Sequence, residues 1–97
     1  MNNSQLSRKN EAAKRKFLKA MQPLAGRFTV GSLDWNFIPK RECVEIHQFF
    51  TFKGTELRFD YSFALTEPLP KVAYIRTLLW SSVNEWMGAH PQLLVDA

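Results

Sequence analysis

The clearest strand signal in the chain is Leu57-Arg58-Phe59-Asp60-Tyr61-Ser62-Phe63-Ala64-Leu65. Its odd positions are all apolar or aromatic, and its even positions are mostly polar or charged. Alternation with a period of two predicts a β-strand with one buried face and one face in water. A strand of this kind belongs to an antiparallel sheet that is covered on one side only.

A second strand pattern lies just before this stretch. Lys53-Gly54 separates the two and is typical of a short hairpin turn. The apolar face of the second strand carries Val44, Ile46, Phe50 and Phe52. The two segments therefore predict a β-hairpin.

A third, earlier strand pattern changes phase part-way along. The alternating residues are Phe28, Val30, Leu33, Trp35 and Phe37. The alternation slips at Gly31-Ser32, and a slip at glycine predicts a β-bulge or bend. Pro39 should end this strand and Lys40-Arg41 should form the turn that follows, so we expect three strands within residues 27–66.

Helical spacing precedes the strands. We expect residues 1–5 to fray and a helix to run over residues 6–21, capped by Ser4 or Ser7. Pro23 disfavours helical geometry at the residue before it, and Gly26 marks a turn. Three- and four-residue spacings predict that the buried stripe of this helix comprises Leu6, Ala13, Phe17, Ala20, Met21 and Leu24.

A second helix is expected over residues 71–87, with Gly88 as its C′ residue. Its apolar stripe comprises Val72, Ile75, Leu79, Val83 and Trp86. Residues 88–97 form a tail. The chain of 97 residues is too short for two hydrophobic cores, so residues 1–97 are one domain. The predicted fold is α+β: a three-stranded antiparallel sheet flanked by an N-terminal basic helix and a C-terminal amphipathic helix, in the order α-β-β-β-α.

Charge is concentrated at the N-terminal end. Residues 1–27 carry seven basic residues and one acidic residue, net +6, whereas residues 28–97 carry six basic and eight acidic residues, net −2. Such asymmetry indicates a basic arm that meets an acidic protein surface or nucleic acid. We expect the contacts to come from Lys14, Arg15, Lys16 and Lys19. Phe17 is the single aromatic residue among them, which argues against a stacking platform for single strands.

The side-chain inventory argues against an enzyme and against any metal or cofactor. Cys43, His47 and His90 are the only strong nitrogen or sulfur ligands, whereas a structural zinc site needs four. On one strand, Cys43 and His47 would lie about 13 Å apart, too far for a nucleophile and its base. A single cysteine favours a reducing compartment. No apolar run approaches the ~20 residues that span a membrane.

The second helix carries more aromatic rings than one buried face can hold. Helical geometry places Trp80 about 120° from both Tyr74 and Trp86. Exposed aromatic area often marks an interface, so we expect these three rings to contact a partner. Two alternatives stay open: the apolar tail Leu93-Leu94-Val95 covers them, or a second copy of the chain does so in a homodimer.

The loop Glu67-Pro68-Leu69-Pro70 connects the last strand to the second helix. Its simplest role is a rigid connection. A sharper prediction is that Pro68 contacts a host prolyl isomerase, because an exposed X-Pro bond can be cis.

Taken whole, the chain resembles the anti-RecBCD proteins of Salmonella lambdoid phages. The likeness rests on the opening Met1-Asn2-Asn3-Ser4-Gln5-Leu6-Ser7-Arg8-Lys9, the length of 97, the α-β-β-β-α order and the Glu67-Pro68-Leu69-Pro70 loop. It covers essentially the full chain. It is an overall likeness, and no motif of functional residues can be carried over from it.

The resemblance implies an early phage protein that acts in the host bacterial cytoplasm. It would bind the host nuclease RecBCD through the RecC subunit, so that the complex loses its Chi response and serves phage recombination. Direct DNA binding is not required for this role. A DNA mimic should be strongly acidic, so the net charge of +4 excludes mimicry and favours docking on protein. The first rival hypothesis is a small basic nucleic-acid-binding protein, and the second is an enzyme on an unfamiliar template.

Overall fold

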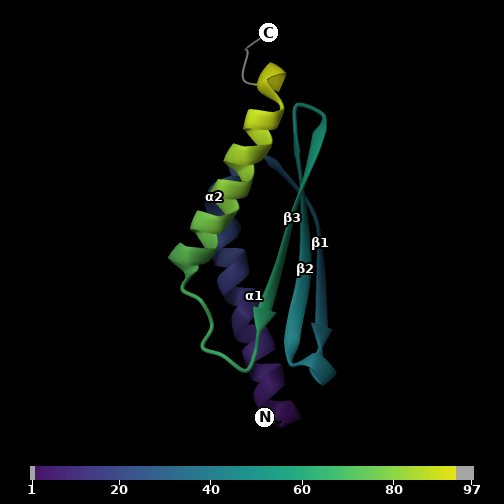
Figure 1. Ribbon diagram of the computed structural model, residues 1–97, viewed down its shortest axis with the longest axis vertical. Coiled ribbons are helices and arrows are strands. Elements are labelled where there is room, and N and C mark those ends of the chain that lie inside the picture. Colours follow the sequence, from purple (N-terminus) through teal and green to yellow (C-terminus); the bar gives the residue numbers. More distant parts are fainter. Residues whose placement is uncertain (1, 94–97) are drawn as a thin grey trace.

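The computed structural model describes residues 2–93 and places the elements in the predicted α-β-β-β-α order (Figure 1). The chain forms an elongated molecule of 54 × 21 × 20 Å. The helices are α1 (Asn3–Ala25) and α2 (Val72–Ala89), and the strands are β1 (Thr29–Ile38), β2 (Cys43–Phe52) and β3 (Thr55–Ala64). Two short 3-10 turns, Pro39–Arg41 and Pro91–Leu93, complete the described chain.

The sheet is antiparallel throughout, with strand order β1-β2-β3. The predicted hairpin turn at Lys53-Gly54 is confirmed. Lys53 has a φ of 49° and Gly54 a φ of 78°, and positive φ at both central residues is the geometry that matches strand twist in tight hairpins. The predicted bulge is confirmed as well, because the β1–β2 register shifts between Val30 and Leu33.

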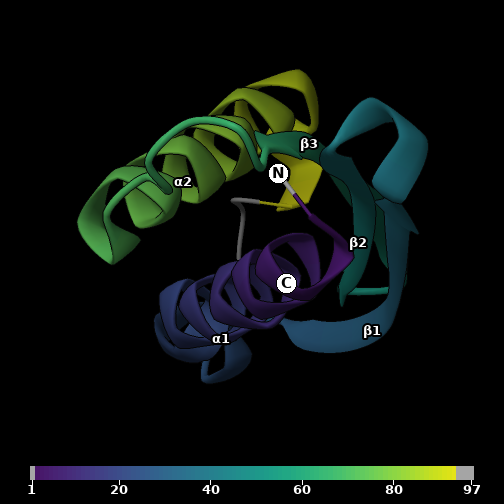
Figure 2. The same ribbon diagram turned by 90° about the horizontal axis from the view of Figure 1, so that it is seen from below.

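Both helices lie on the same side of the sheet and pack against each other, with α1 next to β1 and α2 next to β3 (Figure 2). Phe17 lies at the centre of the core. Its ring is fully buried, 6.2 Å from the ring of Trp35 and 6.3 Å from that of Phe59. The predicted apolar stripe of α1 is buried in full: Leu6, Ala13, Phe17, Ala20, Met21 and Leu24.

The N-terminal end of α1 differs from the prediction. Residues 2–5 are not frayed, and neither Ser4 nor Ser7 is the cap. Asn2 is the N-cap: its side chain accepts from the backbone N–H of Gln5 at 2.9 Å, while the Gln5 side chain accepts from the Asn2 N–H at 3.0 Å. This reciprocal capping box satisfies two backbone donors and starts the helix at Asn3.

The C-terminal end of α1 also differs, because the helix does not stop at Met21 and passes through Pro23 to Ala25. Proline lacks the N–H that would bond the carbonyl four residues earlier, which is that of Lys19. Arg76 supplies the missing donor: its Nη2 donates to the Lys19 carbonyl at 3.1 Å. A side chain from α2 therefore offsets part of the cost of proline in α1.

Helix α2 is longer than predicted at its C-terminal end. Gly88 lies inside the helix and is not the C′ residue, and His90 is the C-cap. Ile75, Leu79 and Val83 form the buried stripe, with Val72 and Trp86 partly buried against the same core. The prediction that the tail covers the aromatic rings falls largely on residues 94–97, which lie outside the described chain.

Candidate interaction surfaces

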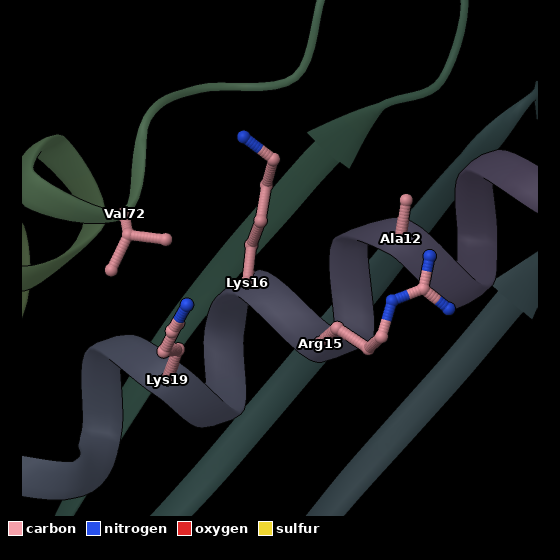
Figure 3. A pocket seen from close by; sticks show the side chains of 5 residues that line it. All are labelled: Ala12, Arg15, Lys16, Lys19 and Val72. Carbon is pink, nitrogen blue, oxygen red and sulfur yellow. The ribbon is translucent and has the colours of Figure 1, made fainter.

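The basic residues of α1 do not share one direction. Successive helical positions turn by 100°, so Lys14, Arg15 and Lys16 project to different sides. Arg15, Lys16 and Lys19, with Ala12 and Val72, line a pocket of about 380 Å³ between α1 and the start of α2 (Figure 3). Lys14 is exposed and does not line it. The structure thus brings together three of the four predicted basic residues.

Lys16 has a structural role as well. Figure 3 shows its side chain reaching away from α1 toward the loop that enters α2. Its Nζ donates to the main-chain carbonyl of Pro70 at 3.2 Å. Lys9, about two helical turns earlier, donates to the carbonyl of Glu67 at 2.9 Å. These two lysines hold the β3–α2 loop against α1, a role that the charge pattern alone did not reveal.

The charged side chains that line the pocket are all positive. Arg15, Lys16 and Lys19 form no ion pair with a carboxylate of residues 2–93. Repulsion among the three cations is relieved when an anionic group enters between them. The pocket is therefore suited to a carboxylate or phosphate from a partner.

The three predicted aromatic contacts separate into two kinds. Tyr74 is 55% exposed, whereas Trp80 and Trp86 are partly buried against the core. The Trp80 ring lies beneath the guanidinium of Arg27 at 5.6 Å, and the Trp86 ring packs edge-on against Phe52 at 6.4 Å. Tyr74 alone among them offers a large apolar area to a partner.

Tyr74 lies close enough to β3 to affect a second tyrosine. Burial raises the pKa of Tyr61 above its usual value, and the charge of Tyr74 adds to the rise. Tyr61 faces the core, where its ring meets Phe63 at 4.9 Å. The exposed ring of Tyr74 therefore sits over the α2–β3 side of the core.

Pro68 is exposed in the loop between β3 and α2. No peptide bond within residues 2–93 is cis, so the Glu67-Pro68 bond is trans. A contact with a prolyl isomerase stays a prediction. It can be checked by NMR, following the Pro68 Cβ–Cγ shift difference and the loop signals as an isomerase is added.

Cys43 and His47 both lie on β2, on the sheet face that carries no helix. On β3, the cross-strand neighbour of Cys43 is Ala64, whose methyl side chain cannot act as an acid, a base or a metal ligand. His47 instead pairs with Asp60 of β3, with its Nδ1 2.6 Å from the Asp60 Oδ1, and Arg58 Nε lies 2.9 Å from the same oxygen. Within residues 2–93, no three His, Cys, Asp or Glu side chains cluster as metal ligands would.

One surface escaped the sequence patterns. An open apolar groove of about 210 Å³ lies between α1 and β1, lined by Leu18, Met21, Gln22, Ala25, Val30 and Gln48. Leu18 stands among charged residues on α1, and Val30 stands next to the bulge. An apolar residue on the charged side of the helix was the signal available in the sequence.

No protein-family model, curated protein or solved structure matches this chain. The likeness to anti-RecBCD proteins therefore stays a prediction. No helix of residues 2–93 is both long and apolar enough to cross a membrane.

Proposed function

We propose that this protein is a phage-encoded modulator that docks on the host nuclease RecBCD, through RecC, by protein–protein contact. The nuclease would then lose its response to Chi and promote phage recombination in the host cytoplasm. The partner is taken from the resemblance. The observation that supports docking is the α1–α2 pocket, whose three cationic side chains have no carboxylate partner within residues 2–93.

Charge and shape contribute to different steps of binding at such a surface. Long-range attraction steers an acidic partner toward α1, and close-packed contacts then determine how long the complex lasts. Arg15 and Lys19 line the pocket without a hydrogen bond to the described chain through their side chains, so both are available to a partner. The exposed ring of Tyr74 would add apolar contact area near the entrance to α2.

The arrangement favours a protein partner over a nucleic-acid backbone. A protein that follows a phosphate backbone needs many cations in a row, and its affinity falls steeply with salt. Here Lys9 and Lys16 donate to loop carbonyls, and Lys14 projects away from the pocket. The cations that remain suit a single acidic site better than a long polyanion.

The direct test is capture of purified RecBCD by the full-length protein. Arg15→Glu and Lys19→Glu should each weaken capture by roughly tenfold, because each reverses a charge that meets an acidic side chain. Lys40→Glu is the matched control: it makes the same charge change on an exposed residue of the Pro39–Arg41 turn and should bind normally. Lys16 is unsuitable for this test, since its loss would also loosen the β3–α2 loop.

Absence of co-elution at micromolar concentrations would rule out the proposed partner. Equal weakening by all three variants would show that net charge matters and the pocket does not. Nuclease assays on DNA with and without Chi would report the functional effect. The nucleic-acid alternative predicts duplex binding at low salt that is lost steeply by about 200 mM, with no nuclease present.

A further inference from the structure

Exposed apolar area is concentrated at one place on the described chain. Its exposed large hydrophobic residues are Leu18, Val30 and Tyr74, and the first two line the same groove. Leu18 is 49% and Val30 41% exposed. An apolar cavity of about 150 Å³ can hold a benzene molecule. A groove of about 210 Å³ therefore has room for one Leu or Phe side chain.

The groove runs beside an open edge of the sheet. β1 is an edge strand of ten residues, and β2 is the one strand of residues 2–93 that pairs with it. No main-chain hydrogen bond joins β1 to any other element of that part of the chain. An open edge presents N–H and C=O groups that can bind a further strand.

Natural proteins protect such edges with lysine, proline or a bulge. β1 contains neither lysine nor proline, and Asp34 is its one charged residue. The bulge is limited to Gly31-Ser32, and Leu33 to Ile38 pair regularly with β2. Leu33 to Ile38 therefore form a regular edge that can accept a neighbouring strand.

The charge beside the groove indicates which neighbour fits. Lys14 precedes Leu18 by one helical turn, is exposed, and forms no ion pair within residues 2–93. The first 27 residues carry a net charge of +6. A second copy docking here would bring two such helices together, and like charges repel. An acidic segment is attracted instead.

We propose that the β1 edge and the Leu18–Val30 groove together bind an extended acidic segment of a partner protein. The segment adds as a fourth strand beside β1 and places one large apolar side chain between Leu18 and Val30. Main-chain hydrogen bonds supply affinity in this mode, and the pocket for the side chain supplies specificity. This surface is separate from the α1–α2 pocket and requires no assumption about the nuclease.

The test titrates a synthetic peptide into the isotope-labelled full-length protein and follows it by NMR. The peptide is about ten residues long, the length of a typical long strand. It alternates Asp with Val and has one central Phe, and its ends are blocked. Amide signals of β1 and of the groove should shift, and exchange of the β1 amides with solvent should slow.

Four variants locate the site. Leu18→Glu and Val30→Glu should each weaken binding about tenfold or more, because each places a carboxylate where the apolar side chain and the acidic peptide must sit. Lys14→Glu should weaken binding about threefold and remove part of its salt dependence. Tyr74→Glu is the matched control, because it makes the same kind of change at the one exposed large apolar side chain that does not line the groove, and it should leave the affinity for the peptide unchanged.

Three results would overturn the proposal. The first is the absence of saturation at about 1 mM peptide, a concentration that would saturate even weak specific binding. The second is unchanged affinity in the two groove variants, and the third is protection of β1 by a concentration-dependent dimer, which would make a second copy the occupant. RecBCD is absent from this experiment. Failure here would leave the proposed docking on RecBCD untouched, and failure of that docking would leave this groove untouched.

Discussion

Arg76 of α2 donates a hydrogen bond to the main-chain carbonyl of Lys19 in α1, with 3.1 Å between Nη2 and the oxygen. That carbonyl is the one that Pro23 leaves without its helical donor. The bond therefore ties the two helices together at the point where the first helix is weakest.

Removing this donor should destabilise the protein more when Pro23 is present than when it is replaced. Arg76→Met should lower the free energy of unfolding by about 1–2 kcal/mol, since a charged donor is lost. Pro23→Ala restores an N–H to the Lys19 carbonyl, so Arg76→Met should cost clearly less in that background. Urea denaturation of the original protein, the two single variants and the double variant gives the coupling energy between Arg76 and Pro23. Equal costs in both backgrounds would contradict this explanation, and Arg15→Met serves as a surface control.

The buried amide of Gln48 should also stabilise the protein through its hydrogen bonds. Its Nε2 lies 3.2 Å from the carbonyl oxygen of Gly31, 3.1 Å from that of Ser32 and 3.0 Å from that of Phe49, and its two N–H groups, shared among these acceptors, hold the bulge against β2. Gln48→Leu keeps the size but removes the donor, and should cost about 1–3 kcal/mol in denaturation experiments. The exposed Gln22→Leu should stay within about 0.5 kcal/mol of the original protein. A Gln48→Leu protein of unchanged stability would contradict a net stabilising role of these hydrogen bonds.

The capping box predicts an asymmetry between two neighbouring asparagines. Asn2→Ala removes the side chain that accepts from the Gln5 N–H and should cost about 1 kcal/mol. Asn3 is the first helical residue and is exposed, so Asn3→Ala should be neutral or slightly stabilising. Thermal denaturation followed by circular dichroism compares the two. Similar losses from both changes would argue against the cap.

Asp60 should make the folding stability of the protein depend on pH in the acidic range. The hydrogen bond from His47 lowers the pKa of Asp60 below its usual 3.8, the charge of Arg58 lowers it further, and partial burial opposes both. A carboxyl with a lowered pKa in the folded state stabilises the protein above the unfolded value of about 3.8, and that contribution is lost as the pH falls through the folded pKa.

Asp60→Asn should therefore be less stable than the original protein near neutral pH, and the gap should close on acidification below about pH 3.8. Urea denaturation across this pH range provides the measurement. Glu56→Gln is the control: it removes an exposed carboxylate from the same strand, one that forms no ion pair within residues 2–93, and it should leave the stability nearly unchanged. A gap that stays constant at low pH would show that the carboxylate charge of Asp60 does not contribute.

The candidate site was predictable in part. Charge counting found Arg15, Lys16 and Lys19, and these do line one pocket. It could not show that Lys14 projects elsewhere or that Lys9 and Lys16 fasten a loop more than fifty residues away in sequence. Nor did aromatic content separate Tyr74, which is exposed, from Trp80 and Trp86, which are partly buried.

Sequence patterns alone were enough to predict the element order, the hairpin turn, the bulge and the buried stripe of α1. Each of these follows from the alternation of neighbouring residues or from the φ and ψ angles that one residue allows, and such preferences act within a few positions of the chain.

Tertiary contacts were needed for α1 to continue through Pro23, for the buried Gln48 amide to find acceptors at the bulge, and for Leu18 and Val30 to form one groove. In each case the deciding partner is distant in sequence: Arg76 for Pro23, Gly31 for Gln48, and β1 for Leu18. The conformational preference of a residue can be overridden when a group distant in sequence supplies a missing hydrogen bond or covers an exposed apolar surface.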